Sequence, residues 1–138
     1  MKEDVIVRVT GWQEATGDTI ETISRGSIRR EGSCLVIEYE DEALTDEPAG
    51  PVQQNRLTVG PDWVEMRRTG EVRSFLRFAA GVMEEGSYET PFGTLSAGVL
   101  TRDLKIRESA EGLEVRIRYG LWMNGAFVSE CRAEISVR

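Results

Sequence analysis

The sequence contains no histidine among its 138 residues. A Ser-His-Asp or Cys-His catalytic centre needs an imidazole that accepts the nucleophile's proton near neutral pH. Zinc sites usually need several Cys or His ligands at short spacing, and this chain has only Cys34 and Cys131, which are far apart. The composition therefore predicts no metal, no other cofactor and no catalytic residue set, so an enzyme is the third and least favoured class of function.

Basic residues are also scarce, with 17 Lys and Arg against 24 Asp and Glu and a net charge of −7. Such a chain repels phosphate backbones on average, so we expect no nucleic-acid partner. No stretch approaches the roughly 18–20 apolar residues that span a bilayer, and no basic segment with an apolar run resembles a signal peptide. We expect a cytoplasmic protein without membrane contact, in which both cysteines are reduced thiols.

What the sequence has instead is period-two alternation of apolar and polar residues, which places successive side chains on opposite faces of a strand. The clearest example lies at 113–121, where the odd-numbered residues are apolar and charged residues lie between them. Strands are expected at 5–12, 18–30, 33–41, 52–59, 63–69, 72–80, 87–92, 95–107, 113–121 and 127–137. Pro48, Gly50 and Pro51 predict a loop at 41–51, and Asn124-Gly125 predicts a tight hairpin.

This pattern predicts an all-β fold in one domain over residues 1–138. Roughly ten short strands at spacings of about 8–12 residues are typical of a sandwich or barrel, and no segment predicts a helix of about ten residues or more. Hairpin-like connections favour an up-and-down order, and closure removes the exposed strand edges. We therefore expect a closed antiparallel β-barrel of about eight to ten strands, mainly up-and-down.

The sequence also resembles the YwiB-like bacterial proteins of unknown function over most of its length. The resemblance rests, in chain order, on the Val-rich N-terminal strand, Leu35-Val36-Ile37-Glu38-Tyr39-Glu40, Arg68-Thr69-Gly70, Leu76-Arg77-Phe78, Gly81, Tyr88-Glu89-Thr90-Pro91-Phe92-Gly93, Thr101, Tyr119-Gly120-Leu121 and Asn124-Gly125. It implies a calycin-like, lipocalin-type barrel and supplies no reaction. The adjacent Gly11 and Trp12 depart from the lipocalin pattern, in which one residue separates Gly from Trp.

The first candidate site is a ligand cavity inside the barrel. Side chains that line it if they face inward are Tyr39, Phe78, Tyr88, Tyr119 and Leu121. A barrel of this size encloses either packed side chains or one small ligand. A plain aromatic core therefore explains the same residues.

The second candidate is a basic group at the hairpin around Gly70, formed by Arg67, Arg68, Arg73 and Arg77. Guanidinium groups bind carboxylates or phosphates through a planar fork of donors. Pairing with Glu65 and Glu71 across the strands is the alternative explanation. Inward orientation of Arg68 or Arg77 would favour the ligand site, because a buried guanidinium needs a partner.

The third candidate is the segment from Tyr88 to Thr101, including Thr90, at the mouth of the barrel. Pro91, Gly93 and Gly98 allow a close approach of a ligand to the backbone, or else they relieve strain in a bent sheet. Pro91 within the strand at 87–92 further predicts a sheet edge or a distorted ladder.

Two classes of function remain ahead of an enzyme. The first is a small-ligand-binding module that holds an anionic or amphipathic molecule in the barrel or at its mouth. The alternative is a homodimeric interaction or assembly protein, with Trp12, Trp63 and Trp122 as anchors where these indoles are exposed.

Overall fold

Ten strands make up the fold in the computed structural model, which describes residues 2–41, 53–70 and 72–138. The strands are β1 (Glu3–Gln13), β2 (Thr19–Glu31), β3 (Cys34–Asp41), β4 (Gln53–Val59), β5 (Trp63–Thr69), β6 (Arg73–Ala79), β7 (Met83–Thr90), β8 (Gly93–Ser109), β9 (Gly112–Met123) and β10 (Ala126–Val137). The loop expected at 41–51 lies outside the described residues beyond Asp41, and so does Glu71.

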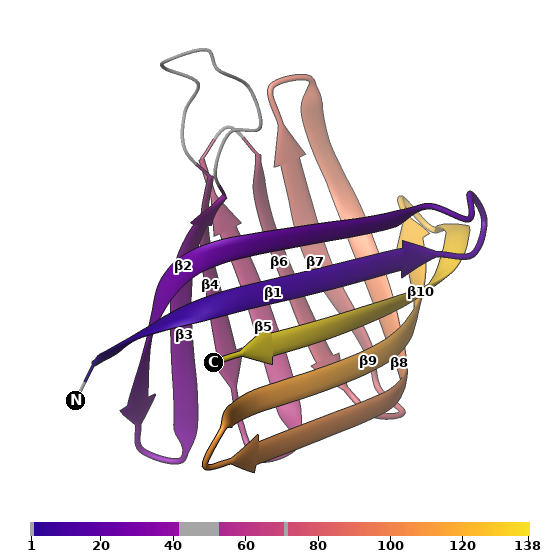
Figure 1. The fold of residues 1–138 in the computed structure, drawn as a ribbon. Coiled ribbons are helices and arrows are strands. Elements are labelled where there is room, and N and C mark those ends of the chain that lie inside the picture. Colours follow the sequence, from indigo (N-terminus) through magenta and orange to yellow (C-terminus); the bar gives the residue numbers. More distant parts are fainter. Residues whose placement is uncertain (1, 42–52, 71) are drawn as a thin grey trace.

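The strands form a closed antiparallel barrel (Figure 1). Each strand pairs with its neighbours in the sequence, and β1 also pairs with β10, from Val7 opposite Val137 to Gln13 opposite Cys131. This closure leaves no open sheet edge along the paired segments. The predicted up-and-down β-barrel is therefore confirmed.

The inner wall of the barrel carries the apolar side chains of the alternating pattern. Buried residues on facing strands pack into one cluster, which includes Val7, Ile37, Leu57, Val115 and Ile135. Burial of apolar surface contributes roughly 25 cal/mol per Å² and drives the wall to close on itself. The barrel is thus filled by its own side chains over much of its length.

Turns and irregularities account for the differences from the predicted strands. Asn124 and Gly125 both have positive φ, 49° and 80°, as the predicted tight hairpin requires. Pro91 lies in the turn after β7 rather than inside a strand, so the edge predicted from it is absent, and β7 begins earlier, at Met83. A register shift between Phe127 and Ser129 turns Phe127 to the outer wall, although the alternation placed it with the core residues.

Both cysteines are free thiols, with Cys131 buried and Cys34 half-buried. Within the part of the chain that the structure describes, no helix has the length and apolar character needed to cross a bilayer.

Candidate functional site

Five polar or aromatic side chains form a continuous row around the inner wall at one end of the barrel. The backbone register places Tyr39 opposite Asn55, Asn55 opposite Arg68, Arg68 opposite Ser74, and Ser74 opposite Tyr88. Each residue lies within two positions of the end of its strand, at the top of Figure 1 where β3, β5 and β7 end. We call these five residues the mouth row.

The mouth row is largely shielded from solvent. Tyr39, Asn55 and Ser74 are buried, with 8% of Asn55 exposed, while Arg68 and Tyr88 are half-buried. Arg68 Nε donates a hydrogen bond of 3.1 Å to Asn55 Oδ1. Because this bond engages Oδ1, the amide nitrogen Nδ2 is the Asn55 atom that remains for a further hydrogen bond.

Asn55 Nδ2 is buried and has no hydrogen-bond partner among the described residues. A buried polar group without a partner costs about 1–3 kcal/mol, and such groups are rare in folded proteins. An amide NH₂ offers two donors, and a guanidinium offers five. The mouth row therefore gathers donors in a place where an oxygen acceptor would lower the free energy.

The layer beneath the mouth row is apolar. Leu57, Met66 and Leu76 face the interior one layer further in, and Leu57 is almost fully buried. Apolar surroundings lower the local dielectric constant and strengthen the attraction between a guanidinium and an anion. They also limit how deeply a ligand can enter, so a ligand would lie at the mouth rather than in the centre of the barrel.

The three other predicted lining residues, Phe78, Tyr119 and Leu121, belong to the packed core. Phe78 is 1% exposed and packs edge-to-face on Tyr119, with ring centroids 4.9 Å apart. Leu121 also packs against this cluster. For these residues the structure favours the aromatic-core explanation.

Arg77 and Thr90 lie away from the interior row. Arg77 faces the outer wall, where it donates a 2.9 Å hydrogen bond to Glu65 and lies over the Trp63 ring. The Thr90 hydroxyl stabilises the β7–β8 turn by donating to the Gly93 carbonyl and accepting from the Phe92 amide. Arg77 therefore does not line the barrel, and its pairing with Glu65 follows the cross-strand alternative.

Sequence reasoning missed Asn55 and Ser74. The alternation in the fourth strand placed Asn55 on the same face as the core residues Leu57 and Val59. A polar residue at a core position usually has a functional role, so this position was a detectable signal of a site. Ser74 likewise shares its face with Leu76 and Phe78. What the sequence could not supply was the register that joins both residues to Arg68.

A second polar group inside the barrel involves Tyr119 and Cys131, which lie opposite each other on β9 and β10. Burial raises the pKa of the Tyr119 phenol above its ordinary value of 10.0, and the neighbouring Cys131 thiol adds to the shift. Burial also raises the pKa of Cys131. Both groups are thus held in their neutral forms and do not resemble an activated nucleophile.

This burial predicts a loss of stability in alkali. The neutral phenol of Tyr119 is favoured in the folded state, so its contribution to stability is present below the unfolded pKa and falls as pH rises above about 10. We expect Tyr119→Phe to flatten the decline in unfolding free energy between about pH 9 and about pH 11, measured by urea denaturation. Equal slopes in both proteins would contradict this assignment.

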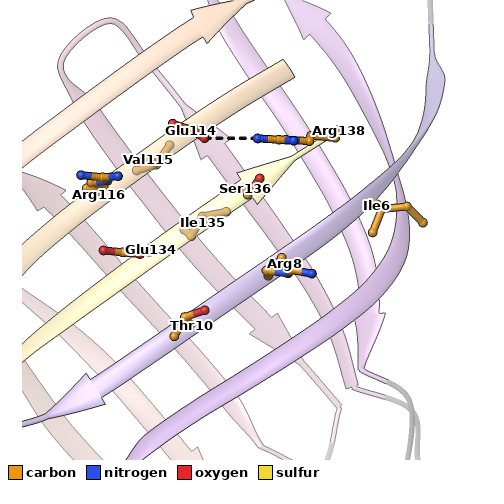
Figure 2. Close-up of a pocket in the computed structure, with 10 residues that line it drawn as sticks. All are labelled: Ile6, Arg8, Thr10, Glu114, Val115, Arg116, Glu134, Ile135, Ser136 and Arg138. Atoms are coloured by element: carbon orange, nitrogen blue, oxygen red, sulfur yellow. Dashed lines mark ion pairs between the residues drawn. The ribbon is translucent and has the colours of Figure 1, made fainter. Parts of the chain in front are cut away.

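A hollow of about 460 Å³ lies on the outer wall, over β10 and between β1 and β9 (Figure 2). Arg8, Arg116 and Glu134 line this hollow. Arg138 and Glu114 also line it and form an ion pair, in which Arg138 Nη2 lies 3.6 Å from Glu114 Oε1. Exposed ion pairs of this kind contribute about 0–1 kcal/mol. Positive and negative side chains both line this hollow, so its charge does not favour one class of ligand. The mouth row, in contrast, gathers hydrogen-bond donors that favour an anion.

Comparisons with known proteins agree with this description. A family model described as a domain of unknown function, DUF1934, matches residues 6–135. The crystal structure of ywiB protein from Bacillus subtilis is similar, with a TM-score of 0.78 and 19% sequence identity over 99% of this chain and 92% of that chain. No curated protein matches this chain.

The structural match shows a shared barrel fold, and the resemblance to YwiB-like proteins is confirmed. Because the family model covers nearly the whole barrel, the chain belongs to the DUF1934 family, whose function is unknown.

Proposed function

We propose that this protein is a small-ligand-binding module that holds the anionic group of its ligand at the mouth row. The observation that carries the proposal is the buried Asn55 Nδ2, which has no partner among the described residues and is adjacent to the inward-facing Arg68. A carboxylate or phosphate oxygen placed there would accept from Asn55 and would lie beside the guanidinium. Hydrogen bonds to charged groups are roughly twice as strong as those between neutral groups.

The rest of the row limits the size and chemistry of the ligand. Tyr39 and Tyr88 place an aromatic ring near each end of the row, and Ser74 adds a hydroxyl between Arg68 and Tyr88. The packed core below excludes a long apolar tail from the interior. A compact anion with a short apolar or planar body fits this arrangement.

The test is native mass spectrometry of the protein purified from its own host. We expect a fraction of the wild-type protein to carry a small molecule with an acidic group. Asn55→Leu and Arg68→Met should each lose most of it, since removing one hydrogen bond to a charged group costs about 1.5–3 kcal/mol, or roughly a tenfold or greater loss of affinity.

Arg73→Met is the matched control, because Arg73 is an exposed residue at the same end of the barrel and has no ion pair among the described residues. It should keep the bound molecule. Wild-type protein without any bound molecule, or retention by Arg68→Met, would refute the proposed function.

A further inference from the structure

The inner wall of the barrel carries a single positive charge at the mouth row. Arg67 precedes Arg68 in the chain, so alternation turns it to the outer wall, where it lies over the Phe75 ring. Arg56 lies opposite Arg67 and faces the same way, and Arg73 is exposed. Arg68 is therefore the one cation that faces inward at this end, among the residues that the structure describes. The other members of the mouth row are uncharged.

This charge favours a monoanion over a dianion. A carboxylate carries one negative charge, which equals the one positive charge that faces this space, and Asn55 Nδ2 adds neutral donors. A phosphate monoester carries about −1.5 to −2 charges at pH 7. The excess would lie above an apolar layer, in a protein whose net charge is already −7. The interior thus suits a carboxylate better than a phosphate.

Space for the body of such a ligand lies between Arg68 and Tyr88. Ser74 has the smallest side chain of the mouth row and lies opposite both residues. Neighbouring strands are about 4.8 Å apart, so the backbones at Arg68 and Tyr88 are separated by roughly 10 Å. On the other side, Tyr39 lies directly opposite Asn55, and no small residue separates them. A six-membered ring over Ser74 would contact the Tyr88 ring while its carboxylate stays at Arg68.

We propose that the ligand is an aromatic monocarboxylic acid, with its carboxylate at Asn55 and Arg68 and its ring over Ser74 against Tyr88. Tyr88 is then the residue that selects a ring, because aromatic pairs are stabilised by offset or edge-to-face contact as well as by buried area. This inference rests on the proposed function, since it requires the anion site. It adds the charge and the shape of the ligand.

The first test compares two probes with the same ring and different charges, benzoate and phenyl phosphate, by titration calorimetry of the full chain. Benzoate should bind at least about tenfold more tightly, because phenyl phosphate places an uncompensated charge in the mouth. Phenyl phosphate that binds as tightly as benzoate would overturn the assignment to a carboxylate. Failure of both probes, with an acidic molecule still bound to protein from the host, would overturn the ligand class and leave the anion site intact.

The second test locates the ring. Tyr88→Leu should weaken benzoate binding by roughly three- to tenfold and leave the affinity for acetate, which has no ring, unchanged in an NMR titration. Asn55→Leu should weaken the binding of both acids. Phe92→Ala is the matched control, because it removes a fully exposed ring at the same end of the barrel and should change neither affinity. Far-UV circular dichroism checks that each variant folds. Unchanged benzoate binding in folded Tyr88→Leu would overturn the position of the ring and leave the anion site intact.

Discussion

Phe78→Ala is expected to lower the free energy of unfolding by about 3–5 kcal/mol, a large fraction of the total stability of a domain of this size. Phe78 is almost completely buried in the hydrophobic core, and its ring packs against Tyr119. Truncation loses the transfer free energy of the ring and leaves a cavity that a closed wall cannot fill by collapsing. Urea denaturation, followed by Trp fluorescence, measures the change.

Two variants keep the Phe78 experiment interpretable. Phe92→Ala removes a phenyl ring that is fully exposed at the β7–β8 turn and should change stability by no more than about 0.5 kcal/mol. Phe78→Leu retains most of the volume and should cost less than Phe78→Ala, so it remains measurable if the alanine variant does not fold. Equal effects of Phe78→Ala and Phe92→Ala would contradict a packed barrel interior.

Gly112→Ala should lower the unfolding free energy by about 3 kcal/mol or more, by a mechanism that involves no cavity. Gly112 begins β9 with a φ of 141°, a conformation that L side chains rarely adopt. A Cβ there would also lie 2.1 Å from the Val137 carbonyl oxygen, at the end of the adjacent β10. Strain costs about 1–3 kcal/mol, and forcing the two strands apart costs a similar amount.

Gly11→Ala is the matched control for Gly112→Ala. Gly11 lies within β1, its φ is not in the left-handed region, and a Cβ there would meet nothing within 4 Å. This substitution should be neutral, or stabilising by less than about 1 kcal/mol through the reduced entropy of the unfolded chain. Both measurements use thermal or urea unfolding. A Gly112→Ala protein as stable as Gly11→Ala would show that the register between β9 and β10 is wrong.

The barrel could be predicted from the sequence because two properties of the chain agree with each other. Alternation over almost every segment assigns an inner and an outer face, and frequent turns leave no room for long crossovers. The observed closure between β1 and β10 follows, since open edges on such a sheet would be exposed to aggregation. Where the alternation changes phase, as at the bulge between Phe127 and Ser129, periodicity alone gives the wrong face.

The mouth row could be predicted only in part. Tyr39, Arg68 and Tyr88 were candidates from their residue type, but their alignment depends on four hairpin registers that the sequence does not specify. Arg77 was also a candidate, although it lies between Leu76 and Phe78 in the sequence and alternation places it on the other face from these core residues. A shift of one residue in a strand exchanges its two faces, so inward orientation follows from the register and not from composition.

The proposed anion site is tested most directly by a crystal structure of the protein purified from its own host. We expect density for a bound molecule with an oxygen roughly 2.7–3.2 Å from Asn55 Nδ2 and from the Arg68 guanidinium. Asn55 Nδ2 bonded to a side chain of the same protein, with no bound molecule at the mouth and Arg68 turned towards bulk solvent, would contradict it.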